Sequence, residues 1–320
     1  MVIPVYRGAE TLATVVHELL ASSARWRHVD VSEIILVHDH GPDDSARVIR
    51  DLEDAHPVVR SVWLTKNFGQ HAATLAGMSA ASGEWVVTID EDGQHDPASI
   101  PDLIARAIET HSPIVYGSPT NPPAHGRFRN WSSRTAKSFV AGAAGVPALE
   151  YAQSFRLITG DVARSAASYA GPGAYLDVVL AWIGARSVTS PTRSRVDGRP
   201  SGYRFRTLLS HFWRLVLSAG TRPLRAIALI GALFASASLV LAVVFAVDRL
   251  SGADFPPGFA ALIVATLLSA GVILVSLGVI AEYLGALIKV ALGRPAFLIG
   301  SDPAEGPLGR DLDPRELVQR

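Results

Sequence analysis

The chain has 320 residues, which is enough for one large domain or two modest ones. Its 29 basic residues balance its 29 acidic ones, so the overall charge gives no indication of nucleic-acid binding. The absence of cysteine excludes disulfide bonds, thiolate metal sites and a cysteine nucleophile.

The first half of the chain alternates short apolar runs with amphipathic stretches. The apolar runs, which we expect to be strands, are Val2–Tyr6, Glu33–Val37, Val59–Leu64, Trp85–Asp90 and Pro113–Tyr116. The amphipathic stretches, which we expect to be helices, are Glu10–Ser23, Asp43–Ala55, Gln70–Ala81 and Pro101–Thr110. This alternation predicts an α/β domain with a mostly parallel sheet and right-handed crossovers.

Two acidic residues mark the edge of the sheet at which a ligand would bind. Asp39 follows the second apolar run and Asp90 ends the fourth. Sheets of this kind bind ligands at the carboxyl ends of their strands, so both residues are expected at that edge. No GxGxxG follows the first strand, which argues against a dinucleotide-binding Rossmann domain.

An acidic cluster, TIDEDGQH, stands where the fourth run ends. In an extended turn, Asp90, Asp92 and Gln94 would present alternate oxygen atoms on one side. Hard cations such as Mg²⁺ and Mn²⁺ take oxygen ligands of this kind. A solvated acidic turn has the same pattern, so the cluster alone leaves both interpretations open.

Two further loops follow the second and third runs. In HDHGPDDS, Asp39 could accept a hydrogen bond from a base N–H, whereas Asp43 or Asp44 is expected to cap the next helix. In KNFGQH, Gly69 allows close backbone approach, and the helix that begins near Gln70 offers N–H groups to an anion. Each loop also fits ordinary turn chemistry, and we interpret the histidine of the second loop, His71, as structural.

Two segments in the last third of the chain, Ala226–Val247 and Phe255–Ala281, carry no charge. Each is long enough for a helix that spans the roughly 30 Å hydrocarbon core of a bilayer. We therefore expect a membrane hairpin with spans at about 226–247 and 258–281. Basic residues flank the hairpin, so the positive-inside rule places both termini in the cytoplasm and makes the chain a multi-pass protein of the cytoplasmic membrane.

Arg204–Ala219 has an apolar face set against arginines, which is typical of an interfacial helix lying on the membrane. An ordinary amphipathic helix packed on the domain would show the same pattern. The tail from Ser301 is rich in Asp, Pro and Gly and is expected to be disordered. The expected division is a catalytic domain at 1–203, an interfacial helix and linker at 204–225, a membrane hairpin at 226–293 and a cytoplasmic tail at 294–320.

The order of motifs along the chain resembles that of family 2 glycosyltransferases. The motifs are VIPVY, VHDHGPDDS, NFGQHAA, TIDEDGQHDP, VYG, FRNWSS, SFRLI and RVDGRPSGY. The similarity continues through the two apolar segments to AEYLG and GRPAFLIG, so it covers almost the whole chain. Within the family, the chain resembles the branch that makes polyprenyl-phosphate sugars, the dolichyl-phosphate mannose synthase and bactoprenol glucosyltransferase type.

This resemblance implies a GT-A nucleotide-sugar-binding domain followed by a two-helix transmembrane hairpin. The residues expected to bind the nucleotide sugar are Pro4, Tyr6, Asp39 and Asp90. Asp90 and Asp92 would be catalytic, and Asp92 and Gln94 would hold a divalent cation, Mg²⁺ or Mn²⁺.

The acceptor phosphate would bind to basic and hydroxyl side chains further along the chain. Arg129 and Ser133 match the acceptor-phosphate positions of the family, and their spacing places them on one helix face with Lys137 one turn later. Arg195 is a second candidate for contact with the anion. A solvated basic face is the alternative interpretation.

The expected function is that of a membrane-anchored inverting glycosyltransferase. It would move a sugar from a UDP-, GDP- or dTDP-linked donor to polyprenyl phosphate for cell-envelope glycan synthesis, and we expect a homo-oligomer. His38, Arg7-Gly8 and Ser118-Pro119 depart from the family pattern, so the nucleotide stays open. The alternatives are a processive polysaccharide synthase, whose QxxRW motif and additional helices we do not find, and a catalytically silent scaffold that only binds nucleotide sugar.

Overall fold

A computed structural model describes four parts of the chain, which are residues 1–120, residues 151–195 except 185 and 194, single positions between 229 and 251, and residues 258–305. The expected interfacial helix at 204–225 and most of the first expected span lie outside the described residues. So do three of the candidate acceptor residues, Arg129, Ser133 and Lys137.

The described part of the chain forms one sheet of eight strands in the order β7-β5-β6-β4-β1-β2-β3-β8. The strands are β1 (Val2–Val5), β2 (Ile34–His38), β3 (Val59–Leu64), β4 (Trp85–Thr88), β5 (Ile114–Pro119), β6 (Arg156–Thr159), β7 (Ser187–Thr192) and β8 (Ile299–Gly300). The helices are α1 (Leu12–Ser23), α2 (Ser45–Ala55), α3 (Gln70–Ala80), α4 (Ile100–Thr110), α6 (Gly160–Tyr169), α7 (Leu176–Trp182) and α10 (Phe259–Ala291). The expected α/β domain is confirmed.

The sheet is mixed rather than parallel throughout. β4, β1, β2 and β3 are parallel neighbours, as the crossovers through α1, α2 and α3 require. β6 lies antiparallel between β4 and β5, and β8 lies antiparallel to β3. Because β6 runs in the opposite direction, its first residue lies at the edge where β4 ends.

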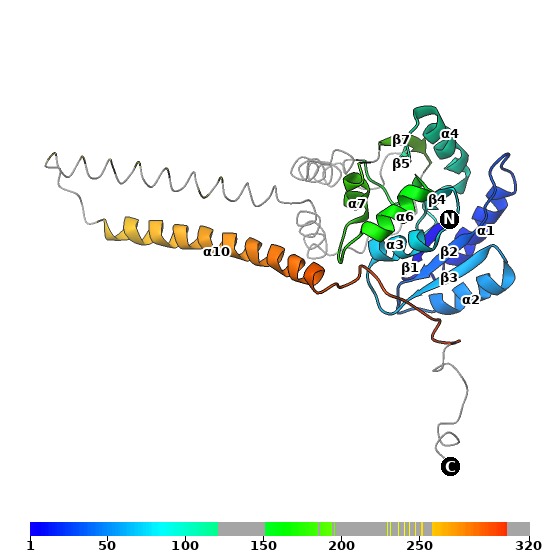
Figure 1. Cartoon of the computed structure of the whole chain (residues 1–320), viewed down its shortest axis with the longest axis horizontal. Helices are drawn as coiled ribbons and strands as arrows, with labels where there is room; N and C mark the ends of the chain where they lie inside the picture. Colours follow the sequence, from blue (N-terminus) through cyan, green and yellow to red (C-terminus); the bar gives the residue numbers. More distant parts are fainter. Residues whose placement is uncertain are drawn as a thin grey trace, which may run out of the picture.

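The helices cover both faces of the sheet (Figure 1). Successive residues of a strand point to opposite faces. In β2, for example, Ile35 and Val37 pack with α3, α6 and α7, whereas Ile34 and Leu36 pack with α1, α2 and α4. Burial on both faces explains why the central strands are continuous apolar runs instead of alternating ones.

Helix α10 extends away from the domain (Figure 1). It has 33 residues, and at about 1.5 Å per residue it is longer than the hydrocarbon core of a bilayer. In the described part of the chain it is the one helix long and apolar enough to cross a membrane. The qualifying segment among the described residues is Leu268–Ala291, with a mean hydropathy of 2.1, and it overlaps the expected span at 258–281. The expected hairpin is not confirmed, because its first helix lies largely outside the described residues.

After α10 the chain returns to the domain and adds β8 to the free edge of β3 (Figure 1). The Thr65 N–H donates to the Leu298 carbonyl at 3.1 Å. Asp302 is only 5% exposed and forms an ion pair with Arg50. The expected disorder of the tail is therefore wrong for residues 301–305, because a single arginine on α2 neutralises the acidic start of the tail.

Candidate active site

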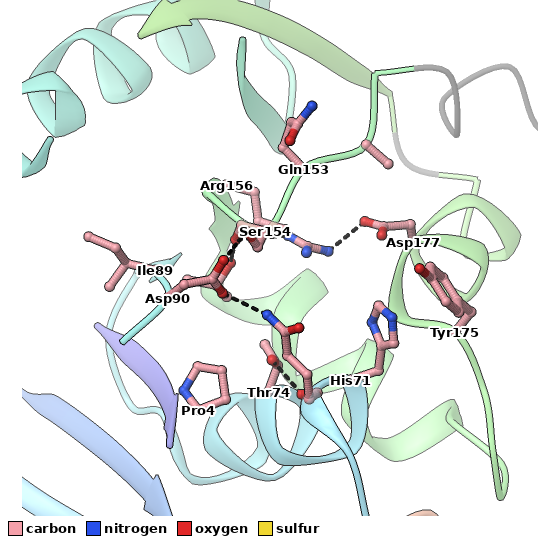
Figure 2. Close-up of a pocket in the computed structure, with 13 residues that line it drawn as sticks. Pro4, His71, Thr74, Ile89, Asp90, Gln153, Ser154, Arg156, Tyr175 and Asp177 are labelled. Carbon is pink, nitrogen blue, oxygen red and sulfur yellow. Dashed lines mark hydrogen bonds and ion pairs between the residues drawn. The ribbon is translucent and has the colours of Figure 1, made fainter. Parts of the chain in front are cut away.

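The carboxyl edge of the sheet carries a cavity of about 200 Å³ beside Asp90 (Figure 2). β1 contributes Pro4, the residues directly after β4 contribute Ile89 and Asp90, and the chain entering β6 contributes Ser154 and Arg156. The N-termini of α3 and α7 close the other side. The expectation that Asp39 and Asp90 lie at one edge of the sheet is confirmed.

Asp90 is held by three side chains. Its Oδ1 accepts a hydrogen bond from Gln70 Nε2 at 2.6 Å, and its Oδ2 lies 2.5 Å from Ser154 Oγ and 3.3 Å from His95 Nε2. Burial alone would raise the pKa of Asp90, but the hydrogen bonds and nearby positive charge outweigh it and keep the pKa below its usual value. Asp90 is therefore an ionised carboxylate fixed in one orientation.

Glu91, the middle residue of the acidic cluster, binds the loop after β1. Its two carboxylate oxygens accept hydrogen bonds from the backbone N–H groups of Tyr6 and Arg7 at 2.9 and 3.0 Å. Burial raises the pKa of Glu91 in spite of these bonds. The cluster is tolerated partly because one of its carboxylates stabilises the loop after β1, a role that the sequence pattern did not indicate.

Asp92, Gly93 and Gln94 form a turn shortly after Asp90 and are not among the described residues that line the cavity. The Gln94 N–H donates to Asp92 Oδ1 at 3.0 Å, and Gly93 has a φ of +74°, which favours glycine. Across the described residues no three His, Cys, Asp or Glu side chains are grouped to hold a metal by themselves. One or two carboxylate oxygens of this turn nevertheless fit a hard cation that takes its other ligands from substrate phosphates.

Asp39 is buried at 2% exposure, and its carboxylate binds the backbone. Oδ1 accepts from the Phe68 N–H at 2.7 Å and Oδ2 accepts from the Gly69 N–H at 2.9 Å. Burial raises the pKa of Asp39, although both hydrogen bonds oppose the shift. Gly69 has a φ of +91°, so this glycine provides backbone conformation at the start of α3 instead of close packing. Asp39 thus fixes the loop between β3 and α3.

The loop after β2 is held by Asp43. Asp43 accepts hydrogen bonds from the Ala9 N–H at 3.0 Å and from the backbone and hydroxyl of Ser45. Asp44 occupies the N-cap position of α2 without a capping hydrogen bond and instead pairs with Arg47. Of the two expected capping residues, Asp43 therefore makes the hydrogen bonds.

The two remaining residues expected to bind the nucleotide sugar, Pro4 and Tyr6, lie at the end of β1. Pro4 lines the cavity. Tyr6 is 38% exposed as a residue, and the Arg7 guanidinium lies 5.6 Å from its ring centroid. An exposed aromatic ring at this edge is available for stacking on a flat ligand.

Arg195 lies beside the acidic turn and is already paired. Its backbone N–H donates to the Gln94 carbonyl at 2.8 Å. Its guanidinium lies 2.5 Å from Glu18 Oε2 and 4.0 Å from Asp96 Oδ1. An acceptor phosphate at Arg195 would therefore have to displace a carboxylate.

The sequence did not single out a buried ion pair that lines the cavity. Arg156 Nη1 lies 2.5 Å from Asp177 Oδ1, which also accepts a hydrogen bond from the Tyr116 hydroxyl at 3.1 Å. Burial, together with the charge of Asp177, keeps the pKa of Tyr116 well above its ordinary value. The SFRLI motif contains Arg156, but no local pattern marks Asp177, so only the fold reveals the pair.

Comparison with known proteins identifies the family. The model of glycosyl transferase family 2 matches residues 1–168. The chain belongs to glycosyl transferase family 2. Membership of family 2 confirms the resemblance expected from the motif order, and with it the expected class of enzyme, a glycosyltransferase.

Two relatives and one solved structure show how far the likeness extends. The chain is 30% identical over 305 residues to an undecaprenyl-phosphate 4-deoxy-4-formamido-L-arabinose transferase of Pseudomonas fluorescens, covering 93% of this chain and 88% of the relative. It is 27% identical to the enzyme of the same name from Proteus mirabilis, covering 93% and 92%. The crystal structure of mannosyl-3-phosphoglycerate synthase from Rubrobacter xylanophilus superposes with a TM-score of 0.51 at 15% identity, covering 70% and 73%. That likeness supports a GT-A-like α/β fold with a mixed sheet.

Proposed function

We propose that this protein transfers a sugar from a nucleotide sugar to polyprenyl phosphate. The observation that carries the proposal is the fixed carboxylate of Asp90 and the adjoining Asp92 turn beside a cavity, in a chain similar over nearly its whole length to undecaprenyl-phosphate sugar transferases. The product would be a polyprenyl-phosphate sugar for cell-envelope glycan synthesis.

The donor would bind along the carboxyl edge of the sheet. Pro4, Tyr6 and Asp39 would contact the nucleotide, and Asp90 would lie beside the sugar diphosphate. Asp92 and Gln94 would hold Mg²⁺ or Mn²⁺, which when bound stabilises the negative charge on the departing nucleoside diphosphate. The hydrogen bonds to Asp90 and the turn at Gly93 support this assignment, because they fix the oxygen atoms before a ligand arrives.

The acceptor would supply its own nucleophile. A phosphate monoester has its second pKa at about 6, so its oxygen is largely ionised near neutral pH and needs no strong general base. Arg129, Ser133 and Lys137 would bind the acceptor phosphate. Arg195 would give up its ion pair with Glu18 and bind the phosphate as well. The backbone contact of Arg195 with Gln94 supports the nearness of donor and acceptor.

The proposed arrangement in the cell follows the expected division of the chain. Residues 1–203 and the tail at 294–320 would lie in the cytoplasm, 204–225 would lie on the membrane surface, and 226–293 would form the hairpin. The apolar segment Leu268–Ala291 supports the second span. Assembly as a homo-oligomer belongs to the same proposal.

A turnover assay tests this function. The full-length protein would be incubated with radiolabelled UDP-, GDP- and dTDP-sugars and with undecaprenyl or decaprenyl phosphate. We expect one donor to label the lipid. A product that grows to a polymer would favour a processive synthase, and donor binding without any labelled lipid would favour a silent scaffold.

A further inference from the structure

We propose that the cavity beside Asp90 holds the transferred sugar of the donor, and that Asp177 makes the site select neutral sugars over sugars that carry a carboxylate. This inference rests on the proposed function and adds to it the chemical class of the sugar and the residue that recognises it.

The geometry places two carboxylates across one small space. Figure 2 shows Asp90 on one side of the cavity and Asp177 on the other, with the Arg156 guanidinium between them. Asp177 Oδ1 receives both the Arg156 and the Tyr116 hydrogen bonds. Within the described part of the chain, no hydrogen bond is made by Oδ2, so this atom can accept one from a ligand.

The charge of the cavity indicates the kind of ligand. Among the described residues that line the cavity, two carboxylates face one guanidinium, which already pairs with Asp177 at 2.5 Å. A phosphate inside the cavity would meet these two carboxylates, so we expect the diphosphate to lie beside the cavity, with the cation of the proposed site, and not inside it. Hydroxyl and amide groups, in contrast, donate well to ionised carboxylates.

The size and the walls of the cavity point to a single ring. A volume of about 200 Å³ lies below the range of about 300–1,000 Å³ typical of sites for drug-sized ligands. The cavity can therefore take one monosaccharide but not a whole nucleotide. One wall is formed by the rings of His71 and Tyr175, whose centroids lie 3.8 Å apart, and these give the apolar face of a sugar a surface on which to pack.

Asp177 is held in a fixed position, so it can discriminate between neutral sugars and uronates. It is 5% exposed and belongs to the first turn of α7, where its position is fixed by the buried Arg156. A uronate would bring a further carboxylate next to Asp177 and Asp90 with no uncommitted cation among the cavity-lining residues described. We therefore expect neutral sugars to bind at least tenfold more tightly than the matching uronates, which is about 1.4 kcal/mol or more.

Calorimetry on the full-length protein tests this inference. The nucleoside diphosphate that the parent binds is first chosen among UDP, GDP and dTDP. The parent is then titrated with that diphosphate alone and with a matched pair of donors, such as UDP-glucose and UDP-glucuronate or GDP-mannose and GDP-mannuronate. We expect the neutral donor to bind at least tenfold more tightly than the uronate.

Three variants test which residues are responsible for the preference for neutral sugars. Asp177→Asn should reduce the neutral-to-uronate ratio at least fivefold while leaving affinity for the nucleoside diphosphate within twofold. Tyr175→Ala, which leaves the Arg156–Asp177 pair intact, should weaken both sugar donors at least fivefold and again spare the diphosphate. Asp161→Asn makes the same chemical change in the first turn of the neighbouring helix α6, outside the cavity, and should change neither quantity.

The outcomes separate this inference from the proposed function. A parent that binds no nucleoside diphosphate contradicts the proposed function. A parent that binds the diphosphate but does not distinguish the matched donors contradicts the inference alone. Loss of diphosphate binding in Asp177→Asn would show that this variant does not fold. In that case Tyr175→Ala tests the inference. An equal loss of donor and diphosphate binding in Tyr175→Ala would overturn the assignment of the cavity to the sugar.

Discussion

Arg50 and Asp302 lie 252 positions apart in the chain and form a two-point ion pair, with Arg50 Nε 2.7 Å from Asp302 Oδ2 and Nη2 3.3 Å from Oδ1. The Asp302 side chain is 4% exposed and that of Arg50 is 34% exposed. This pair fastens the segment after α10 to α2, next to the edge strand β8.

Removal of the pair should loosen that segment. Asp302→Ala leaves Arg50 partly buried without its partner, and we expect local opening of β8 to become easier by about 1–2 kcal/mol. Hydrogen exchange of the Thr65 amide, which donates to Leu298, should accelerate. Arg47→Ala on the same helix breaks only exposed pairs with Asp44 and Asp51 and should leave Thr65 exchange unchanged. Equal exchange rates in Asp302→Ala and the parent would show that β8 is held by other contacts.

The acidic turn should prove essential for turnover. Asp92→Asn and Gln94→Ala each remove an oxygen ligand of the expected cation, so we expect loss of glycosyl transfer, and chelation of divalent cations should do the same to the parent. The measurement is labelled lipid product with and without chelator. Full activity of Asp92→Asn in the presence of chelator would contradict the metal assignment.

Arg129 should act on the acceptor instead of the donor. Arginine binds two phosphate oxygens with its planar fork, so Arg129→Ala should lower kcat or raise the apparent acceptor KM at least tenfold, about 1.4 kcal/mol, and Arg129→Lys should recover only part. Steady-state turnover against polyprenyl phosphate and donor calorimetry distinguish the two sites. Unchanged acceptor kinetics with a collapse of donor affinity would move Arg129 to the diphosphate site.

Glu33 should make stability depend on pH. It accepts hydrogen bonds from Ser82 N at 2.6 Å, Ser82 Oγ at 2.8 Å and Arg60 Nε at 2.8 Å. Burial alone would raise its pKa, but these bonds lower it from 4.5 to about 2. Because the folded pKa is depressed, the unfolded state binds more protons between these values. The stabilisation is complete above pH 4.5 and is lost as the pH falls toward 2.

We therefore expect Glu33→Gln to reduce the free energy of unfolding by about 1–2 kcal/mol at pH 7 and by less at pH 3, after allowance for solvent screening. Urea unfolding followed by tryptophan fluorescence at the two pH values measures this. Glu109→Gln, which removes a carboxylate that is 70% exposed in its pair with Arg106, is the matched control and should change little. An effect of Glu33→Gln that grows as the pH is lowered would contradict the assignment.

The topology can be tested by cysteine labelling, since the chain has no cysteine of its own. We expect Gly252→Cys to react with a membrane-impermeant maleimide added outside intact cells, and Ser301→Cys to react only after permeabilisation. Ser301 directly follows β8, which pairs with β3, so its position also reports that of the sheet. Outside labelling of Ser301→Cys with protection of Gly252→Cys would reverse the orientation.

The sequence predicts most local elements of this fold because local periodicity determines them. β3 has the predicted bounds, Val59–Leu64, and the helices predicted at Glu10–Ser23 and Asp43–Ala55 begin two residues later than expected. These differences arise at helix starts, where the chain enters from loops held by distant side chains.

Contacts across the sheet could not be predicted in the same way. Asp39 has its partners 29 and 30 positions later in the chain, and both are backbone N–H groups with no sequence signature. In the sequence, Glu91 cannot be distinguished from its acidic neighbours Asp90 and Asp92. Its separate role follows only from the fold, in which it accepts hydrogen bonds from Tyr6 and Arg7. β6 is a strand of four residues, Arg156–Thr159, whose antiparallel direction follows from tertiary pairing, so the placement of Ser154 and Arg156 at the site followed only from the structure.

Strand β8 also bears on how the chain avoids associating wrongly with copies of itself. An open strand edge is a template for pairing with other chains. β8 covers the Trp63 and Leu64 end of β3, and it is synthesised only after α10. During translation the edge of β3 therefore stays exposed until α10 and then β8 have been synthesised. A polypeptide that ends before Ile299 would lack β8, and its β3 edge would remain unpaired.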